Sequence, residues 1–371
     1  MAASEFMREA LAEAEQALGW SSPNPAVGAI LVRDDEIVGR GHTQPPGEAH
    51  AEVMALRDAG ERARGATAYV TLEPCGHFGR TPPCTRALVD AGVTAVHYAI
   101  EDPDPQVSGD GPRQLLEAGL AVTVGDGAEE ATRLLEGYLK HRRTGLPFVI
   151  AKYAASLDGR IAAASGDSRW VSGPETLLWA HHIRPTLDAI VVGSGTVLID
   201  NPQLTARPGG TIEGAHQPLR VVVDSTGRIS EQAAVMHGPS PALVATTTRS
   251  APEWRERLRA VGAEVLELPE RHGHVDLEAL LGILGGRGAL TVLVEGGGVL
   301  LGSLFDDRLV DRVQVVIAPM IIGAAEAPSA VAGSGAYRMV DAPRLREVTV
   351  ERLGADILVS GLVDWPPTTV G

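Results

Sequence analysis

One histidine and two cysteines that can bind a metal ion lie near a glutamate in the first third of the chain. Glu52 follows His50 by two residues, and Cys75 and Cys84 flank one loop further along. Zinc binds thiolates and neutral imidazole, and a catalytic zinc keeps its fourth position for water. Because two thiolates neutralise the charge of the ion, a base such as Glu52 must help to activate the water. These residues predict hydrolytic removal of an amino group from a nucleobase-like ring.

The spacing of the two cysteines departs from the general deaminase pattern. Zinc nucleobase deaminases carry His-x-Glu followed by Pro-Cys-x-x-Cys, whereas here eight residues separate Cys75 from Cys84. The alternative is a closed structural zinc site with His77 as a fourth ligand, or a buried pair of cysteines. Both alternatives leave Glu52 and the Pro74-Cys75 junction without a role, so the deaminase interpretation is favoured.

The composition bounds the class of protein. The chain has 371 residues, is 44% hydrophobic and carries a formal charge of −15. This length suits two domains, and the acidic balance argues against a nucleic acid as the main partner. The N-terminal residues do not read as a signal peptide, and the sequence shows no segment apolar enough to span a bilayer, so we expect a cytoplasmic protein without a membrane partner. In a reducing compartment, two cysteines favour a metal site over a disulfide.

Strands and helices alternate around the zinc-binding residues. Helices are predicted at residues 4–18, 50–58, 83–91, 111–118 and 128–142, and strands at 26–32, 36–41, 68–72, 94–100 and 121–124. This alternation predicts an α/β sheet with helices on both faces. A basic stretch containing Gly145 and Pro147 predicts a boundary that divides residues 1–145 from residues 146–371.

A second alternating set follows, with two glycine clusters at strand ends. Strands are predicted at residues 148–153, 189–192, 219–224, 243–247, 265–268, 291–294 and 313–317, and helices at 174–183, 252–261, 276–284 and 299–305. Gly193-Ser-Gly195-Thr196 and Glu295-Gly-Gly-Gly298 each follow a strand. Either cluster alone is more often a tight turn, but two at the ends of parallel strands make a dinucleotide site as plausible as a pair of tight turns. Arg184 and Arg207 are candidates to clamp a phosphate, although single arginines are usually solvated or in salt bridges.

Several motifs resemble those of the bifunctional riboflavin-biosynthesis deaminase–reductases. The deaminase half is matched by Pro23-Asn24-Pro25-Ala-Val-Gly28, His50-Ala-Glu52, Pro74-Cys75 and Gly79-Arg-Thr-Pro-Pro-Cys84. The reductase half is matched by Lys152-Tyr-Ala154-Ala-Ser-Leu-Asp158-Gly159-Arg160, Ser168-Arg-Trp170-Val-Ser, residues 195–207 and Glu295-Gly-Gly-Gly298. The chain departs from the family at Thr43, where members often carry histidine. The resemblance implies a cytidine-deaminase-like N-terminal domain and a dihydrofolate-reductase-like C-terminal domain.

The resemblance also implies the cofactors and the residues that contact ligands. Zinc would be held by His50, Cys75 and Cys84, and NADPH would bind the second domain. The implied NADPH contacts are Ala154, Trp170, Thr196, Asp200, Ser225, Gly297, Gly298, Val299, Leu300, Leu301, Gly302 and Ser303. The implied substrate contacts are Asn24, Ser168, Arg184, Leu204, Arg207 and Glu295, with Arg184 and Arg207 on the ribose 5-phosphate.

The implied activity has two steps on one small-molecule substrate. The first removes the 2-amino group of 2,5-diamino-6-(5-phosphoribosylamino)pyrimidin-4(3H)-one, and the second reduces the ribosyl chain to ribityl. Lys152 and Asp200 form a hypothetical catalytic pair for opening the ribose ring, with a structural salt bridge as the alternative, and Ser225 and Arg228 are candidates to contact the 2′-phosphate of NADPH. A homodimer or higher homo-oligomer is expected. The rival functions are a nucleoside or tRNA deaminase with an accessory domain, and a zinc-stabilised nucleotide-binding regulator.

Overall fold

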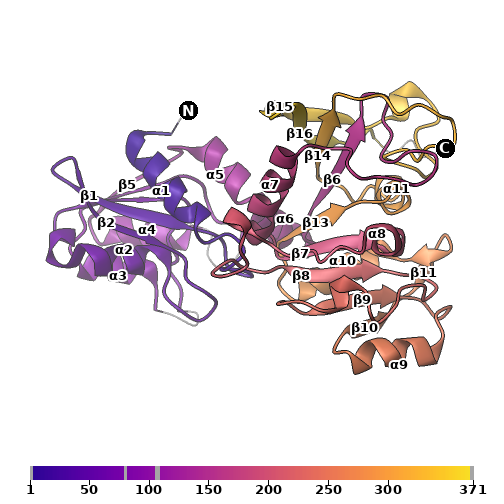
Figure 1. Cartoon of the computed structure of the whole chain (residues 1–371). Helices are drawn as coiled ribbons and strands as arrows, with labels where there is room; N and C mark the ends of the chain where they lie inside the picture. The colour runs from indigo at the N-terminus through magenta and orange to yellow at the C-terminus, as the bar shows by residue number, and fades with distance from the viewer. Residues whose placement is uncertain (1–2, 79–81, 105–108, 368–371) are drawn as a thin grey trace. The chain divides into compact units, whose positions relative to one another are not determined.

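Two separate sheets organise the chain (Figure 1). The structure, a computed structural model, describes residues 3–78, 82–104 and 109–367. The chain divides into two compact units, Met1–Gly145 and Leu146–Gly371, which we call unit 1 and unit 2. Each unit has a sheet of its own, so each can be described by itself.

The sheet of unit 1 has five strands in the order β2-β1-β3-β4-β5. Their bounds are β1 Gly28–Arg33, β2 Glu36–His42, β3 Thr67–Val70, β4 Ala95–Tyr98 and β5 Ala121–Val124. Strand β1 pairs antiparallel with both β2 and β3, whereas β3, β4 and β5 are mutually parallel. The loops that follow the parallel strands β3 and β4 therefore emerge at the same edge of the sheet.

Helices cover both faces of this sheet, as the alternation predicts. The helices are α1 Glu5–Glu15, α2 Ala51–Ala59, α3 Cys84–Asp90, α4 Asp110–Glu117, α5 Ala128–Leu134 and α6 Glu136–Thr144, with the 3-10 turn η1 Gly60–Ala63. Met7, Ala10 and Leu11 of α1 pack with Ile30 and Val32 of β1 on one face. Helix α2 packs on the other face, against two glycines of β2.

The sheet of unit 2 has nine strands in the order β10-β9-β8-β7-β13-β6-β14-β16-β15. Their bounds are β6 Phe148–Ser156, β7 Ala189–Gly193, β8 Leu219–Val223, β9 Ala242–Thr246, β10 Glu264–Glu267, β13 Thr291–Glu295, β14 Arg312–Ala318, β15 Arg344–Leu353 and β16 Asp356–Asp364. The first seven strands in this order are parallel, and β16 and β15 add an antiparallel edge. A separate hairpin joins β11 Glu270–Arg271 to β12 His274–Val275.

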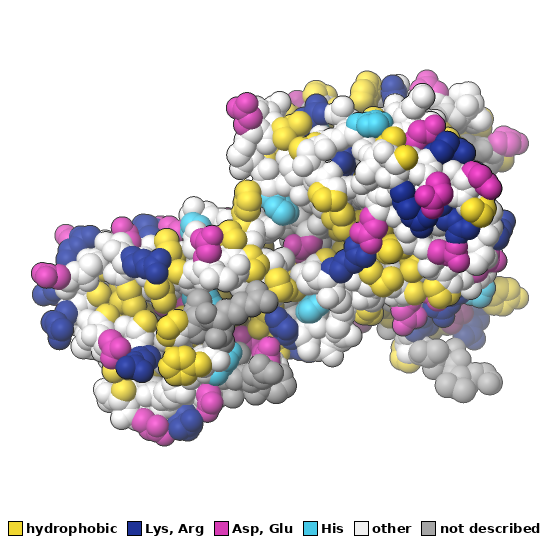
Figure 2. All heavy atoms as spheres, turned by 90° about the horizontal axis from the view of Figure 1, so that it is seen from below, with side chains coloured by type: hydrophobic (Ala, Val, Ile, Leu, Met, Phe, Trp, Pro, Cys, Tyr) yellow, Lys and Arg dark blue, Asp and Glu magenta, His cyan; other side chains and the backbone are white. Residues whose placement is uncertain are grey.

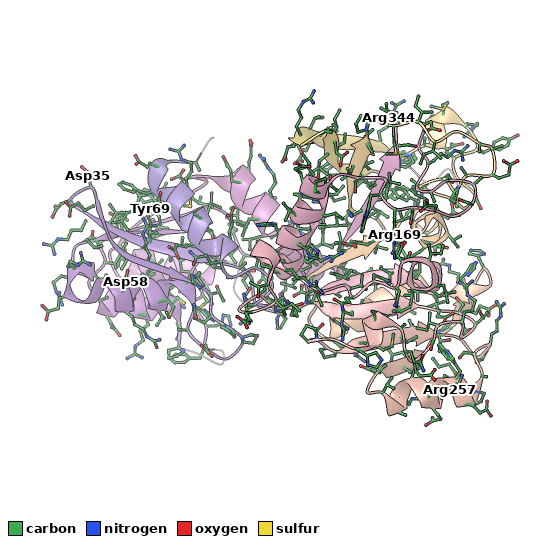
Figure 3. All side chains as sticks on the ribbon, in the orientation of Figure 1. Asp35, Asp58, Tyr69, Arg169, Arg257 and Arg344 are labelled. Carbon is green, nitrogen blue, oxygen red and sulfur yellow. The ribbon has the colours of Figure 1, made fainter. Side chains whose placement is uncertain are left out.

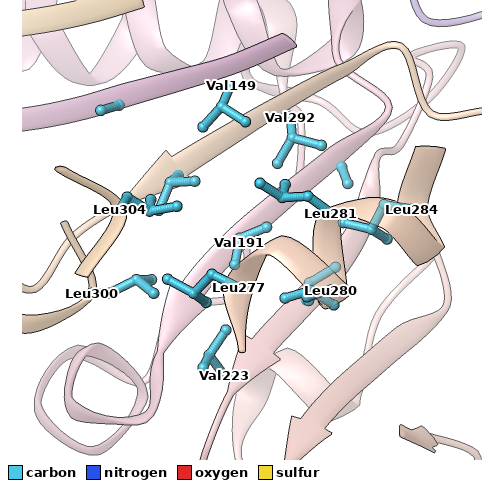
Figure 4. Packing of buried hydrophobic residues seen from close by; sticks show 14 of the residues in the cluster. Val149, Val191, Val223, Leu277, Leu280, Leu281, Leu284, Val292, Leu300 and Leu304 are labelled. Carbon is cyan, nitrogen blue, oxygen red and sulfur yellow. The ribbon is translucent and has the colours of Figure 1, made fainter. Parts of the chain in front are cut away.

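Two buried clusters fill the two faces of this sheet. The helices are α7 Pro174–Ile183, α8 Ser194–Asp200, α9 Pro252–Ala260, α10 Leu277–Gly286 and α11 Gly298–Asp306, with 3-10 turns η2 Arg184–Thr186, η3 Pro208–Gly210, η4 Ala234–Met236 and η5 Met339–Asp341. Figure 4 shows leucines of α10 and α11 packed on the strand valines Val149, Val191, Val223 and Val292. Trp254 and Leu258 of α9 belong to the cluster on the opposite face. Strands buried on both faces read as continuous apolar runs, as the sequence of β7 does.

The structure corrects one predicted helix and adds elements that the sequence did not predict. The single helix predicted at residues 128–142 is two helices, because Leu135 has non-helical backbone angles (φ −97°, ψ 9°). Helix α8 and the strands β15 and β16 were not predicted. Residues 79–81 of the Gly79-to-Cys84 motif lie outside the described residues.

The described surface is mixed in charge. On the face shown in Figure 2, basic side chains (dark blue) are interspersed with acidic ones (magenta). Among the helices of the described residues, none is long and apolar enough to cross a membrane.

Candidate active sites

The three predicted metal ligands converge in unit 1. His50 immediately precedes α2, Cys84 is the first residue of α3, and Cys75 lies in the loop after β3. The Nδ1 atom of His50 lies 3.6 Å from Sγ of Cys75 and 3.3 Å from Sγ of Cys84. The three ligand atoms all lie within 4.8 Å of one another. Three residues from separate elements therefore present one cluster of donors.

This arrangement fits a tetrahedral zinc ion. Zinc bonds of about 2.3 Å to sulfur and about 2.0 Å to nitrogen imply a nitrogen–sulfur separation of about 3.5 Å at tetrahedral angles, close to both measured distances. Hydrogen bonds with Cys84 and His50 lower the pKa of the Cys75 thiol to about 4 against the effect of burial, which favours the thiolate that a metal requires. Among the described residues, His77 is not part of this cluster. The three donors of the cluster therefore leave the fourth coordination position of a zinc ion open.

Glu52 lies beside the ligands, in the first turn of α2. Only 4% of its surface is exposed. Burial, followed by the charge of Cys75, raises the pKa of Glu52 to about 7. A carboxyl group with a pKa near neutrality can both accept and release a proton at physiological pH, which is the property that a proton shuttle needs.

Two glycines of β2 allow α2 to lie close to the sheet. A Cβ atom at Gly39 would lie 2.3 Å from the carbonyl oxygen of Ala55, and one at Gly41 would lie 2.4 Å from the Ala55 nitrogen. Any larger residue would push α2 outward. Because His50 and Glu52 are at the start of this helix, the glycines help to determine where both side chains lie.

Gln114 of α4 connects the backbone segments that follow the two cysteines. Its side-chain amide donates a 2.8 Å hydrogen bond to the carbonyl oxygen of Gly76, next to Cys75. Its Oε1 atom accepts a 2.7 Å hydrogen bond from the hydroxyl of Thr85, next to Cys84. The backbone N–H of Thr85 also donates to the carbonyl oxygen of Cys75 at 3.2 Å. Sequence reasoning missed Gln114, since no local motif marks a residue that acts from a different helix.

Two further residues of unit 1 were singled out from the sequence. Asn24 is half-buried and its backbone N–H donates to the carbonyl oxygen of Ser21. Thr43 is 4% exposed, and its hydroxyl accepts from the N–H of Val27 at 3.2 Å. This hydrogen bond links the start of β1, where the Pro23-to-Gly28 motif lies, to the end of β2, after which the chain continues to His50.

Unit 2 contains a cavity of about 950 Å³ at the carboxyl ends of its parallel strands. Its wall includes Lys152 of β6, Glu295 of β13, Gly193 of β7 and Ser225 after β8. Ligands of open α/β sheets bind at this edge. Most of the residues implied to contact NADPH or the substrate line this one cavity: Ala154, Ser168, Trp170, Arg184, Thr196, Asp200, Leu204, Ser225, Glu295, Gly297, Gly298, Val299, Leu300 and Ser303.

Three implied contacts lie elsewhere among the described residues. Leu301 is fully buried in the core, and Gly302 packs against the carbonyl oxygen of Ala332. Arg207 is not part of the cavity wall, and its Nε donates to the hydroxyl of Thr205 at 3.0 Å. The structure thus places these three residues outside the cavity wall.

Glu295 binds Arg184 at one end of the cavity and lies opposite Lys152 in the pairing of β13 with β6. It forms two hydrogen bonds with Arg184, of 3.3 Å from Nε and 2.9 Å from a terminal nitrogen. Burial raises the pKa of Glu295, but the charges of Arg184 and Lys152 outweigh it and lower the pKa to about 2. Burial also lowers the pKa of Lys152, an effect that Glu295 opposes. Arg184 was considered from the sequence as a phosphate clamp, whereas here its guanidinium is bound to Glu295 and to the Thr205 carbonyl.

Asp200 ends α8 and faces the segment around Ser168. Its carboxylate accepts a 3.0 Å hydrogen bond from the hydroxyl of Ser168. Arg169, labelled in Figure 3, donates to the Asp200 carbonyl oxygen. Lys152 and Asp200 both line the cavity, while the charged neighbours that shift the pKa of Lys152 are Glu295 and Arg184.

The two glycine clusters lie side by side because β7 and β13 are neighbours. The N–H of Gly297 donates to the hydroxyl of Thr196 at 3.3 Å. A Cβ atom at Gly298 would lie 2.4 Å from the carbonyl oxygen of Ser329, and one at Gly302 would lie 2.3 Å from that of Ala332. The glycines of α11 thus admit the 329–333 segment, a role that the sequence pattern alone did not indicate.

Comparison with known proteins identifies a family for each unit. Residues 1–100 match the model of the cytidine and deoxycytidylate deaminase zinc-binding region, and residues 147–359 match the model of the RibD C-terminal domain. Riboflavin biosynthesis protein RibD of Escherichia coli is 41% identical over 361 residues, which cover 95% of this chain and 97% of the relative. The protein of the same name from Bacillus amyloliquefaciens is 39% identical over 358 residues, covering 96% and 95%.

Solved structures show the same likeness in three dimensions. Acinetobacter baumannii RibD is 37% identical and superposes with a TM-score of 0.84 over 96% of this chain and 98% of that chain. A diaminohydroxyphosphoribosylaminopyrimidine deaminase/5-amino-6-(5-phosphoribosylamino)uracil reductase from Thermotoga maritima is 32% identical, with a TM-score of 0.83 over 96% and 97%. Matches of this extent disfavour both an accessory domain and a regulator without activity. The chain belongs to the RibD family of bifunctional deaminase–reductases of riboflavin biosynthesis.

Proposed function

We propose that unit 1 hydrolyses the 2-amino group of 2,5-diamino-6-(5-phosphoribosylamino)pyrimidin-4(3H)-one and that unit 2 then reduces the ribosyl chain of the product with NADPH. The name of the Thermotoga maritima relative describes these two reactions. The observation that carries the proposal is the zinc-compatible geometry of His50, Cys75 and Cys84 beside the buried Glu52. The boundary between the activities is placed at Gly145, where the two compact units divide.

In the deamination, a zinc ion held by His50, Cys75 and Cys84 would supply Lewis-acid activation of a water molecule. Glu52 takes one proton from this water and passes it to a ring nitrogen, and then transfers the remaining proton of the added hydroxyl to the departing amine. Its burial and its raised pKa suit this exchange. Asn24 is assigned to the wall of the same substrate pocket. The products are ammonia and the corresponding uracil, so one amino group is exchanged for one oxygen of water.

NADPH bound along the unit 2 cavity, which Thr196, Gly297 and Ser225 line, would supply the hydride for reduction of C1 of the ribosyl chain. Lys152, buried beside Glu295, is assigned to move the proton that accompanies ring opening, and Asp200 to assist it. Glu295 and Ser168 are assigned to bind the substrate at this end of the cavity. Because Arg184 is held by Glu295, a phosphate would have to share its guanidinium with that carboxylate.

The decisive experiment incubates the full-length, zinc-loaded chain with the diaminopyrimidine phosphate, with and without NADPH. Ammonia release and NADPH oxidation are measured separately. We expect ammonia in both samples and stoichiometric NADPH oxidation only after deamination. Removal of zinc by a chelator should stop ammonia release, while the deaminated substrate is still reduced. Absence of ammonia from the zinc-loaded chain would overturn the assignment of unit 1.

Two finer expectations stay predictions. One is the homodimer or higher homo-oligomer, and the other is the cytoplasmic location.

A further inference from the structure

The last helix of unit 1 carries two polar side chains that the chemistry described above does not use. Tyr138 and Arg142 of α6 lie four residues apart, and therefore on the same side of the helix. In the sequence, the basic residues of this stretch indicated only the boundary at Gly145. In the structure, both side chains contact loops that are linked to the zinc-binding residues.

The first of these loops follows β4 and is fastened to the zinc-binding loop by Glu73. This glutamate is buried and lies two residues before Cys75. Its carboxylate accepts hydrogen bonds from the backbone N–H groups of Asp102, at 3.2 Å, and of Gly109, at 2.7 Å. The loop after β4 is thus held beside the segment that presents Cys75.

Tyr138 holds the same loop from the other side. Its hydroxyl donates to the carboxylate of Asp102 and lies 2.9 Å and 3.0 Å from the two carboxylate oxygens. Both residues are buried. Burial raises the pKa of Asp102, and hydrogen bonds from the Asp104 N–H and the Tyr138 hydroxyl oppose this rise. Because a buried carboxylate that loses a donor is costly, the position of this loop is coupled to Tyr138.

Arg142 connects α6 to a further segment, the one that precedes β1. A terminal nitrogen of Arg142 donates to the carbonyl oxygen of Pro23 at 3.3 Å, next to Asn24. Its Nε atom lies 3.7 Å from the carboxylate of Asp104, and its guanidinium lies 5.1 Å from the ring centroid of Tyr138. One side of α6 therefore holds both the Pro23-Asn24 segment and the loop after β4.

We propose that Tyr138 and Arg142 are positioning residues that determine the affinity of unit 1 for its pyrimidine substrate. The substrate is larger than the ring that reacts at the zinc-binding cluster, so segments next to the cluster are placed to contact the rest of it. Tyr138 acts on the loop after β4 through Asp102, and Arg142 acts on the Pro23-Asn24 segment. The inference rests on the proposed deaminase function of unit 1 and on the assignment of Asn24 to its substrate pocket.

The expected effect is on substrate binding rather than on the chemical step. His50 and Glu52 are positioned by α2, and Cys84 by α3, so the reacting groups do not depend on α6. A displaced loop after β4 or Pro23-Asn24 segment would weaken contacts that are similar in the substrate and in the transition state. Such a loss raises KM and leaves kcat unchanged.

The test measures steady-state ammonia release by the full-length, zinc-loaded chain over a range of concentrations of the diaminopyrimidine phosphate. We expect Tyr138→Phe to raise KM roughly 10-fold, the size of a lost hydrogen bond to a charged group. Arg142→Ala should raise KM about three- to fivefold, because its side chain is 30% exposed and its contacts are weaker. In both variants kcat should change less than about twofold, with zinc content and NADPH-dependent reduction of the deaminated substrate unchanged.

Two further variants separate positioning from a general loss of charge or stability. Arg142→Lys should restore part of the substrate affinity, because it restores the charge beside Asp104 without the fork geometry. The matched control is Arg143→Ala, which removes the same charge from the next residue of α6, an exposed position. This control should leave KM unchanged. In a double-mutant cycle, Arg142→Ala combined with Asp104→Ala should raise KM by less than the product of the two single effects.

The outcomes that would overturn the inference are distinct from those that would overturn the proposed function. Unchanged KM in both Tyr138→Phe and Arg142→Ala would overturn the inference. A lower kcat or a lower zinc content without a change in KM would also overturn it, since α6 would then act on the metal site or on stability alone. A wild-type chain that releases no ammonia would instead refute the proposed deaminase function.

Discussion

The hydrogen bonds of Gln114 predict that a residue far from any metal-binding motif sets the affinity for zinc. Gln114 of α4 bonds to the segments that follow Cys75 and Cys84, at 2.8 Å and 2.7 Å. The proposed change is Gln114→Leu, which keeps the approximate size of the side chain but removes its donor and acceptor. The segments that follow the two cysteines would then lose their side-chain bridge and keep only the backbone hydrogen bond from Thr85 to the Cys75 carbonyl oxygen and the contact of the Cys84 N–H with the Cys75 sulfur.

The expected loss in the free energy of unfolding comes from two hydrogen bonds and one buried hydroxyl, that of Thr85. Each bond contributes about 1 kcal/mol net, and a buried hydroxyl left without a partner costs a further 1–3 kcal/mol, roughly. The residue Thr85 is 2% exposed, so water does not easily replace Gln114. We expect the free energy of unfolding of the zinc-loaded chain to fall by about 3–5 kcal/mol. Loss of a residue that orients metal ligands typically weakens metal binding roughly 10- to 100-fold, and we expect zinc affinity to fall within this range.

The assay is competition for zinc with a chromophoric chelator, together with urea denaturation of the zinc-loaded chain. The control is Arg113→Ala, which changes the adjacent residue of α4, an exposed arginine paired with Asp110 and Glu117. It should leave zinc affinity unchanged. If Gln114→Leu lowered the stability but not the zinc affinity, the cysteines would be positioned by other contacts and this reasoning would be refuted.

Three further predictions concern the proton shuttle, the charge network and the packing of α11. Glu52→Gln should retain zinc but release ammonia at least about 100-fold more slowly, measured by metal analysis and ammonia assay; normal turnover would remove Glu52 from the mechanism. The depressed pKa of Glu295, about 2, means that this residue stabilises the fold above a pH of about 4.5 and that the stabilisation is lost as the pH falls toward 2. Glu295→Gln should lower the free energy of unfolding at neutral pH by about 3 kcal/mol and flatten its decline over this acid range in urea titrations; an unchanged pH profile would contradict the charge network. Gly302→Ala should destabilise the chain by at least about 2 kcal/mol, because its Cβ would lie 2.3 Å from a backbone oxygen, whereas Gly282→Ala, with open space around it, should be neutral or stabilising in thermal denaturation; equal effects would show that the 329–333 segment yields easily.

The sequence predicted the zinc site well because its chemistry is contained in short motifs. His50, Glu52, Cys75 and Cys84 are recognisable by type and spacing, and the structure brings the three ligands together. Contacts between segments that are far apart in the sequence could not be predicted. Gln114 acts on residues of other elements, and Glu295 lies 111 positions from the Arg184 that it binds. The sequence therefore left open whether Arg184 binds a phosphate or a carboxylate of the protein, and its role toward a phosphate stays a prediction.

Most buried strands of both units were predicted because burial leaves apolar runs in the sequence. Strand β15 was missed for the opposite reason. Nine of its ten residues are exposed, and charged residues interrupt its few apolar ones, so the sequence shows no apolar run. Helix α8 was missed because its sequence Ser-Gly-Thr-Val-Leu-Ile-Asp begins with residues typical of a turn, and tertiary packing overrides that local preference.

The close contact between α11 and the 329–333 segment has a consequence for the evolution of the cofactor site. Gly298 and Gly302 lie four residues apart and face backbone oxygens of this segment, and the N–H of Ala332 donates to the carbonyl oxygen of Gly298. Val299, Leu300 and Ser303 of the same helix line the cavity. A substitution in residues 329–333 would therefore move the cavity wall without touching a ligand. Mutant libraries that vary only the cavity-lining residues would therefore not sample changes in cofactor specificity that arise from residues 329–333.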